Sequence, residues 1–235
     1  MDNIVKYVFS PHFLMGAVNT LELCIMAQIA GVLIGFLLAL AKTSRCGAVR
    51  FFADGYIWLF RGIPVLLLLI FVYNALPQFG IRLDEFKSAL VALMFNEAAY
   101  MAEIIRSGLS SVGAEQQRAG YVLGLTKFQI MRYITMPQAL RVIIPPTANQ
   151  FIGMLKLSSL ASVIGFGDLL LVAQQVAGEN FDYVNTLVAV AVYYLVFTAI
   201  FTVVQIFLEK SMDISRKAKY AAEKAGKNAQ DIAAA

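Results

Sequence analysis

The chain has 235 residues, of which 60% are hydrophobic and only 14% are charged, and its mean hydropathy is +0.71. Soluble domains average about 45–50% apolar and about 25% charged residues, so the composition predicts an all-α membrane protein with little room for a second domain. The net charge of +4 does not indicate nucleic-acid binding, because the basic residues follow a membrane pattern described below. A single histidine and two cysteines in unrelated segments argue against a metal site or histidine-based acid–base chemistry.

Five segments are apolar and long enough to cross a hydrocarbon core, which takes about 20 helical residues. In chain order they are residues 20–41, 52–76, 86–109, a stretch within 139–172, and 184–208. The first ends in ALALAK and resembles a signal peptide, but its apolar run exceeds the usual length of about 7–15 residues and no basic segment introduces it. We therefore expect five transmembrane helices and no cleavage.

Lysine and arginine residues are distributed unevenly between the two sides of the predicted membrane. Segments 42–50, 106–141 and 210–227 hold fourteen of the 19, whereas the opposite side holds only Lys6, Arg82 and Lys87. Cytoplasmic loops carry the excess of basic residues. The sequence thus predicts a periplasmic N-terminal segment at residues 1–19, a transmembrane domain at 20–208, and a basic cytoplasmic tail at 209–235.

The cytoplasmic loop at residues 110–138 is polar but has a helical pattern of apolar residues in EQQRAGYVLGLTKFQIMRYITMP. Gly124 interrupts that pattern, Thr126 can cap a new helix, and Pro137 ends that helix or opens the next. A glycine within a helix costs about 1 kcal/mol relative to alanine, so a turn or a close approach is expected at Gly124. Periodicity alone leaves three roles open: a helix lying on lipid, a packed connector, and a docking site for a partner.

The same loop resembles the cytoplasmic signature of permease subunits of ATP-binding-cassette (ABC) importers, which reads Glu-Ala-Ala, three residues, Gly, nine residues, Ile-x-Leu-Pro. The positions that match in spacing are Ala119, Gly124, Ile134 and Pro137. Arg118 replaces the glutamate of that signature and Gly120 replaces its second alanine.

Four further stretches are similar to the polar-amino-acid branch of these permeases, which serves histidine, glutamate, glutamine, arginine or opines. They are RGIPVLLLLIFVY, NEAAYMAEIIRSGLSSV, PQALRVIIPPTANQFIGMLK and SSLASVIGF. The chain departs from the family at Leu157, where an aspartate is usual, and at Glu97, where a small residue is common.

The resemblance implies the type I ABC importer permease fold in a bacterial inner membrane. Two permease subunits, identical or related, would surround the pathway, with two ATP-binding subunits below and a periplasmic solute-binding protein above. The loop would form a coupling helix that docks on the ATPase. Its expected contact residues are Glu115, Arg118, Ala119, Gly120, Gly124 and Pro137. The chain lacks G-x-x-x-x-G-K-[ST], so no enzyme activity or cofactor is expected in it, and ATP and Mg would bind to the partner.

Polar residues inside a membrane are functional candidates because they are costly there. The candidates for a solute pathway are Arg61, Asn96, Glu97, Lys156, Ser158 and Ser159. Purely structural alternatives stay open for these residues. Glu97 and Lys156 can form a salt bridge that only fixes helix packing, Arg61 can extend toward the cytoplasm, and the serines can serve only to bridge helices. Glu97 weakly favours a basic amino acid, because an extra anion attracts a cation.

Two other classes of protein remain as alternatives. A secondary amino acid carrier or channel would work without an ATPase, and a membrane-embedded enzyme would need clustered acids, histidines or an activated nucleophile. Secondary carriers commonly contain inverted repeats, and no repeat is recognisable across the five spans.

Overall fold

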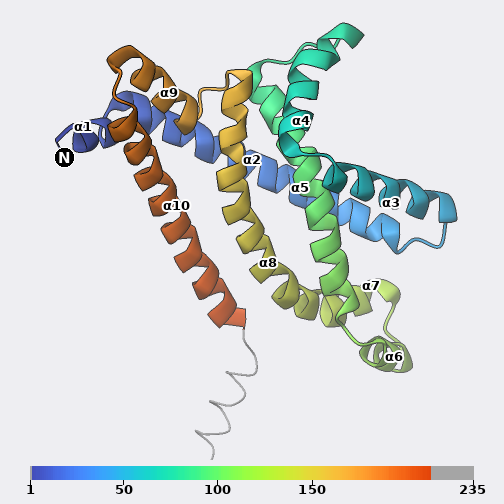
Figure 1. The fold of residues 1–235 in the computed structure, drawn as a ribbon. Helices are drawn as coiled ribbons and strands as arrows, with labels where there is room; N and C mark the ends of the chain where they lie inside the picture. The colour runs from blue at the N-terminus through green and yellow to red at the C-terminus, as the bar shows by residue number, and fades with distance from the viewer. Residues whose placement is uncertain (1, 213–235) are drawn as a thin grey trace, which may run out of the picture.

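The computed structural model describes residues 2–212, and every regular element in that part of the chain is helical (Figure 1). The elements in chain order are α1 Asp2–Val8, α2 Pro11–Lys42, α3 Gly47–Gly62, α4 Val65–Ile70, η1 Phe71–Ala75, η2 Leu76–Phe79, α5 Glu85–Ser110, α6 Ala114–Val122, α7 Lys127–Gln129, η3 Ile130–Thr135, α8 Met136–Leu157, η4 Ser158–Ile164, α9 Leu169–Asn180 and α10 Tyr183–Met212. The elements η1 and η3 are π-helical, and η2 and η4 are 3₁₀-helical.

Three helices among residues 2–212 are long and apolar enough to cross a membrane: α2, α5 and α10. Two bent pairs meet the same criteria, namely α3 with residues 65–79, and residues 127–164 with α9. The structure is therefore consistent with three to five spans, and the predicted five correspond to counting each bent pair as one. The helix predicted from residue 20 begins already at Pro11, where the Ser10 side chain accepts a hydrogen bond from the Phe13 amide.

The apolar segment predicted over residues 52–76 forms two helices that are separated at Pro64, a residue that removes an intrahelical hydrogen bond. Helix α3 ends at Gly62, and the next helical segment, at residues 65–79, lies at an angle of 102° to it. Ile63 has an extended backbone (φ −90°, ψ 132°), as expected for a residue that precedes a proline. By contrast, α8 continues without a break through Pro145 and Pro146, although prolines remove intrahelical hydrogen bonds and commonly kink or break a helix.

The most extensive helix–helix contact is between α2 and α5. Small residues allow it: Gly31 and Gly35 of α2 lie directly against α5, and buried alanines from both helices, including Ala27 and Ala98, have no exposed surface. Small residues are the usual means by which membrane helices approach closely. This contact fixes which residues of α5 face α2, and so positions the polar residues discussed below.

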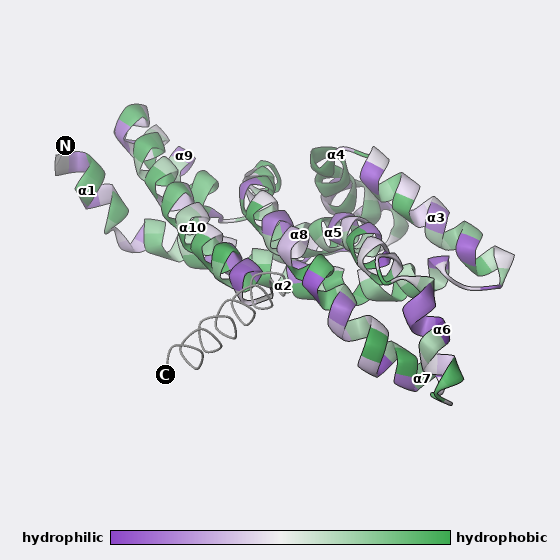
Figure 2. Ribbon diagram, turned by 90° about the horizontal axis from the view of Figure 1, so that it is seen from below, coloured by the Kyte–Doolittle hydropathy of each residue, from purple (hydrophilic) through white to green (hydrophobic). Residues whose placement is uncertain are grey.

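The outer surfaces of α2 and α10 are apolar and exposed, as lipid-facing helices require. Leu33 and Leu37 of α2 are 63% and 65% exposed, and Leu195 and Phe207 of α10 are 68% and 70% exposed. Figure 2 shows α10 as mainly hydrophobic, whereas hydrophilic stretches mark the loop helix α6. Of the predicted basic tail, residues 213–235 lie outside the described part of the chain.

Candidate functional site

The loop between α5 and α8 folds as a helix, a glycine turn and a second helix, which confirms the prediction of its local structure. Helix α6 ends at Val122, and Gly124 two residues later has a φ of +77°, a left-handed conformation that residues with a side chain adopt only with strain. Thr126 then starts α7 with a capping box: its hydroxyl accepts from the Gln129 amide at 3.3 Å, and the Gln129 side chain accepts from the Thr126 amide at 2.8 Å. Pro137 lies in the first turn of α8.

Gly120 has a packing role that its place in the sequence did not reveal. A Cβ atom there would lie 2.9 Å from both Ile130 Cγ1 and Ile134 Cδ1. The absence of a side chain therefore lets α6 pack against η3, so that the two halves of the loop form one unit. Figure 1 shows this unit projecting at one end of the molecule, beyond the ends of α5 and α8.

The projecting end of the loop exposes an apolar surface, which we call the loop tip. Its members are Tyr121, Val122, Leu123 and Phe128, which are between 50% and 87% exposed. Glu115, Arg118 and Ala119 lie exposed on α6 beside it, and neither Glu115 nor Arg118 forms an ion pair with any residue of the described chain. Contiguous exposed apolar surface rimmed by polar residues is typical of protein interaction sites.

A second candidate site is an open hollow of about 440 Å³ at the break between α3 and α4. It is bordered by α3, α5 and α8, and its polar lining residues are Arg61, Asn96, Tyr100 and Gln150. We call it the pathway hollow. The Arg61 guanidinium carbon lies 5.2 Å from the centre of the Tyr100 ring, which is within the range of a cation–π contact.

Asn96 compensates for the helix break at Pro64. In a continuous helix the Phe60 carbonyl would accept from the amide of residue 64, but a proline has no N–H to donate. The Asn96 side-chain amide donates to the Phe60 carbonyl instead, at 2.8 Å. The predicted pathway residue Asn96 therefore also holds the end of α3 against α5.

The ion pair between Glu97 and Lys156, one of the alternatives that the sequence left open, does not form. Among the described residues Glu97 makes no ion pair; it is 2% exposed and accepts a hydrogen bond from Gln150 Nε2 at 3.1 Å, whereas Lys156 is exposed on α8. Ser158 and Ser159 donate to the carbonyls of Leu155 and Lys156 at 2.8 and 2.7 Å. Arg61 and Asn96 line the pathway hollow, but Glu97, Lys156 and the two serines do not.

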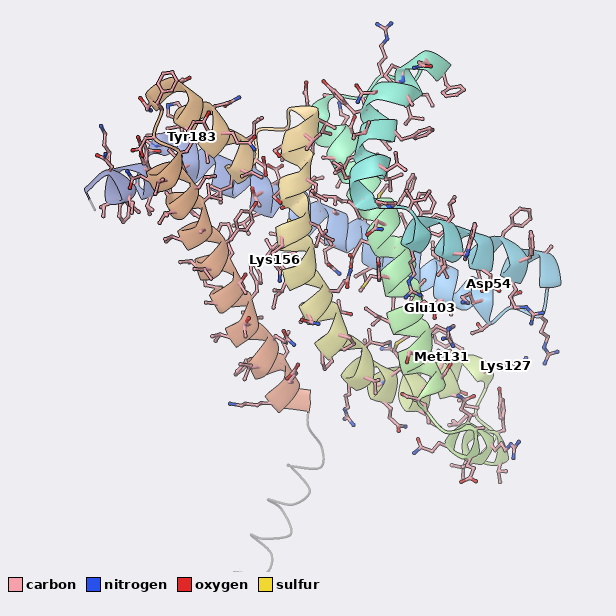
Figure 3. The ribbon with its side chains drawn as sticks, viewed as in Figure 1. Asp54, Glu103, Lys127, Met131, Lys156 and Tyr183 are labelled. Carbon is pink, nitrogen blue, oxygen red and sulfur yellow. The ribbon has the colours of Figure 1, made fainter. Side chains whose placement is uncertain are left out.

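An ionic cluster that the sequence did not reveal lies beside the pathway hollow. Lys42 Nζ is 2.9 Å from Asp54 Oδ1 and 2.6 Å from Glu103 Oε1, and Arg106 Nη2 is 2.9 Å from Glu103 Oε2. Asp54 and Glu103 are labelled in Figure 3. The cluster joins α2, α3 and α5, and it borders an adjoining hollow of about 500 Å³ that shares Arg61 with the first. Only the spacing of Glu103 and Arg106, three residues apart on a helix, was a possible signal in the sequence.

The described residues contain no group of three or more histidine, cysteine, aspartate or glutamate side chains able to hold a metal ion. The first hollow combines cationic, amide and aromatic side chains, and the second adds the carboxylates of Asp54 and Glu103, which together suit recognition of a polar solute.

Comparisons with known proteins agree with this arrangement. The family described as binding-protein-dependent transport system inner membrane component matches residues 31–214. The chain is 38% identical over 200 residues to the probable amino-acid ABC transporter permease protein YckA of Bacillus subtilis, covering 85% of this chain and 88% of that protein. It is 35% identical over 206 residues to the glutamine transport system permease protein GlnP of Escherichia coli K12, covering 87% and 94%.

Solved structures give the same result. A chain from the crystal structure of an amino acid ABC transporter with histidines superimposes with a TM-score of 0.82 at 39% identity, covering 88% of this chain and 96% of that one. A chain of the MetNI methionine ABC transporter, at 18% identity, shares the fold with a TM-score of 0.74. The chain therefore belongs to the family of inner membrane components of binding-protein-dependent transport systems.

Proposed function

We propose that the chain is the permease subunit of an ATP-driven amino acid importer. It forms part of the translocation pathway and couples that pathway to a separate ATP-binding subunit. The observation that carries the proposal is the pathway hollow at the α3–α4 break, connected through α5 and α8 to the projecting loop, in a chain of this family. The relatives named above are amino acid permeases of ABC transporters, which supports this function over an ATP-independent carrier or channel.

In the proposed importer the loop docks on the ATP-binding subunit. The exposed loop tip supplies apolar surface, and Gly124 and Gly120 give the loop its shape. Arg118 is exposed and has no ion-pair partner within the described chain, so it is available to a carboxylate or a carbonyl on the partner. Glu115, one turn earlier, supplies the negative charge that the family signature has at the position of Arg118.

The pathway hollow binds the solute on its way through the membrane. Arg61 offers a fixed positive charge for the carboxylate of an amino acid, and the amides of Asn96 and Gln150 lie in the same hollow. Glu97 lies outside the hollow lining, so it does not attract a basic solute directly. The preference for basic amino acids that was inferred from Glu97 therefore has no support in the geometry. The proposed substrate class is amino acids in general.

The assembly follows from the family. We propose five membrane crossings in a bacterial inner membrane, with the N-terminus outside and the loop and tail in the cytoplasm; the distribution of Lys and Arg supports this orientation. Two ATP-binding subunits, a second permease that is identical or related, and a periplasmic solute-binding protein complete the importer. ATP and Mg bind to the ATP-binding subunits.

The proposal is tested by purifying the tagged chain from its native membranes in mild detergent, identifying the co-purifying proteins by mass spectrometry, and measuring uptake in proteoliposomes. We expect an ATP-binding subunit to co-purify and uptake to require ATP. Gly124→Val should reduce co-purification, because a β-branched residue does not tolerate a φ of +77°. Gly113→Val is the matched control, since Gly113 lies in the same loop with equally open space and an ordinary φ of −56°. A chain that purifies alone and moves solute without ATP refutes the proposal.

A further inference from the structure

Glu97 lies at the point where α2, α5 and α8 meet. It is 2% exposed, and a Cβ atom at Gly31 would lie 2.6 Å from Glu97 Cγ, so α2 packs directly on this side chain. The glutamate therefore occupies a dry position within the membrane-spanning helices, where an ionised carboxylate needs a cationic partner.

The structure provides no such partner within the described chain. The nearest ionisable residues along the helices packed around Glu97 are Cys24 of α2, Arg61 of α3, Tyr100 and Glu103 of α5, and Lys156 of α8. Cys24 is a buried thiol, Arg61 lies over the Tyr100 ring, Lys156 is exposed, and Glu103 is bonded within the ionic cluster. None of them is within ion-pair distance of Glu97.

The hydrogen bonds around Glu97 are unbalanced in a specific way. Gln150 Nε2 donates to Glu97 Oε2 at 3.1 Å, whereas Glu97 Oε1 and Gln28 Oε1 are both buried acceptors without a donor. Gln28 lies one turn before Gly31, the residue of α2 that packs on Glu97, and its Nε2 donates to Met101 Sδ, one turn further along α5, at 3.5 Å. A proton on Glu97 that is donated to Gln28 Oε1 satisfies both oxygens. A turned Gln28 amide would also do so, but it would leave the negative charge uncompensated.

Gln150 connects this buried group to the pathway hollow. It lines the hollow together with Arg61 and Asn96, and its Nε2 is used by Glu97. Its carbonyl Oε1 makes no hydrogen bond to any described residue, so it is available to a solute. An amide held in this way offers an acceptor for an ammonium group near the guanidinium of Arg61, which suits the two charged ends of an amino acid.

We propose that Glu97 is a positioning residue that works in its protonated, neutral form: it bridges Gln28 and Gln150 and so presents the Gln150 carbonyl oxygen to the ammonium or N–H group of the solute. This inference rests on the proposed import function. Glu97 itself contacts no solute, and its neutrality is what allows a glutamate at a position where the family commonly has a small residue.

The protonation state is tested without any transport assay, by infrared spectroscopy of the purified complex. The spectrum of Glu97→Gln should lack a carboxylic-acid C=O band that is present in the spectrum of the wild type. Glu103→Gln is the matched control, because Glu103 is paired with Lys42 and Arg106 and should lose a carboxylate band instead. A carboxylate band lost from Glu97→Gln overturns the proposal, whether or not the protein transports amino acids.

The positioning role is tested by uptake into proteoliposomes containing the whole importer, with whichever of labelled glutamine, arginine or histidine the wild-type complex transports. Glu97→Gln should retain uptake, since its amide can donate to Gln28 Oε1 and accept from Gln150. Glu97→Leu and Gln150→Leu should each lower uptake about three- to tenfold, the effect of one lost hydrogen bond. Asn149→Leu, which replaces an exposed neighbouring amide, is the control and should not lower uptake.

Equal losses in Glu97→Gln and Glu97→Leu, in proteins that purify and melt like the wild type, overturn the positioning role. If the wild-type complex takes up no amino acid at all, the proposed function fails while the infrared result still decides the state of Glu97.

Discussion

The contact between α2 and α5 gives the most direct test of how the fold is held together. A Cβ atom added at Gly35 would lie 2.6 Å from Met101 Cβ, 2.9 Å from the Ala102 backbone nitrogen and 2.9 Å from the Ala98 carbonyl oxygen. Ordinary contacts begin at 3.4 Å, so Gly35→Ala requires a local separation of about 0.8 Å (3.4 less 2.6). Two of the three atoms belong to the backbone and cannot rotate away, so the helices themselves must move apart.

Overpacking of this kind costs about 1–3 kcal/mol, because the neighbouring atoms lose their own contacts when the helices separate. In a chain of this size, about 2–4 °C of melting temperature corresponds to 1 kcal/mol, so we expect a decrease of about 2–12 °C relative to a control that carries the same helix propensity change. That control is Gly55→Ala in α3, where an added Cβ meets nothing within 4 Å and should gain about 1 kcal/mol of helix propensity.

The measurement is the fraction of detergent-purified protein that remains monodisperse after heating, for the wild type and both variants. Met101→Ala should not rescue Gly35→Ala, because alanine keeps the clashing Cβ atom and the two backbone contacts are unchanged. If Gly35→Ala is as stable as Gly55→Ala, or if Met101→Ala restores it, the reasoning from backbone contact is refuted.

Three further predictions concern charged groups. Lys42→Ala leaves the half-buried Glu103 carboxylate with one partner fewer and should destabilise the protein by about 1–3 kcal/mol, measured by the same heating assay. Arg118→Glu should weaken ATPase coupling with the native partner, measured as solute-stimulated ATP hydrolysis, because it reverses the charge offered by α6. The Asn185 side-chain amide donates to the Asp182 carboxylate and holds the pKa of that group below its ordinary value of 3.8. The contact therefore stabilises the protein above pH 3.8, and this stabilisation is lost as the pH falls through the lowered pKa. Asp182→Asn should accordingly be less stable than the wild type at neutral pH and lose that difference in acid.

The first two of these predictions have a matched control variant, and the third is checked by its dependence on pH. Lys6→Ala removes an exposed lysine that forms no ion pair in the described chain and should leave stability unchanged. Lys127→Glu changes the charge of the same loop on α7, outside the α6 surface, and should affect coupling less than Arg118→Glu. Equal effects of Lys42→Ala and Lys6→Ala on stability, or of Arg118→Glu and Lys127→Glu on coupling, would contradict the first two predictions. A stability difference between Asp182→Asn and the wild type that persists unchanged in acid would contradict the third prediction.

The sequence by itself determined the membrane class, the apolar segments and the local fold of the loop, because these depend on residues close together in the chain. Gly124 illustrates this: an interrupted helical pattern followed by Thr126 predicts a turn and a capped helix, and both are present. The family also followed from short motifs in their order along the chain.

Only the tertiary structure decided which polar residues meet. Glu97 bonds to Gln150 and not to Lys156, and the Lys42 cluster joins three helices. Such contacts depend on the rotation of each helix and on how closely neighbours approach, which hydropathy does not encode. Here the close contact at Gly31 and Gly35 turns α5 so that Glu97 faces α2, and the break at Pro64 leaves the Phe60 carbonyl to Asn96. Local periodicity predicts the helices, whereas close backbone packing between distant segments selects the partners of their polar groups.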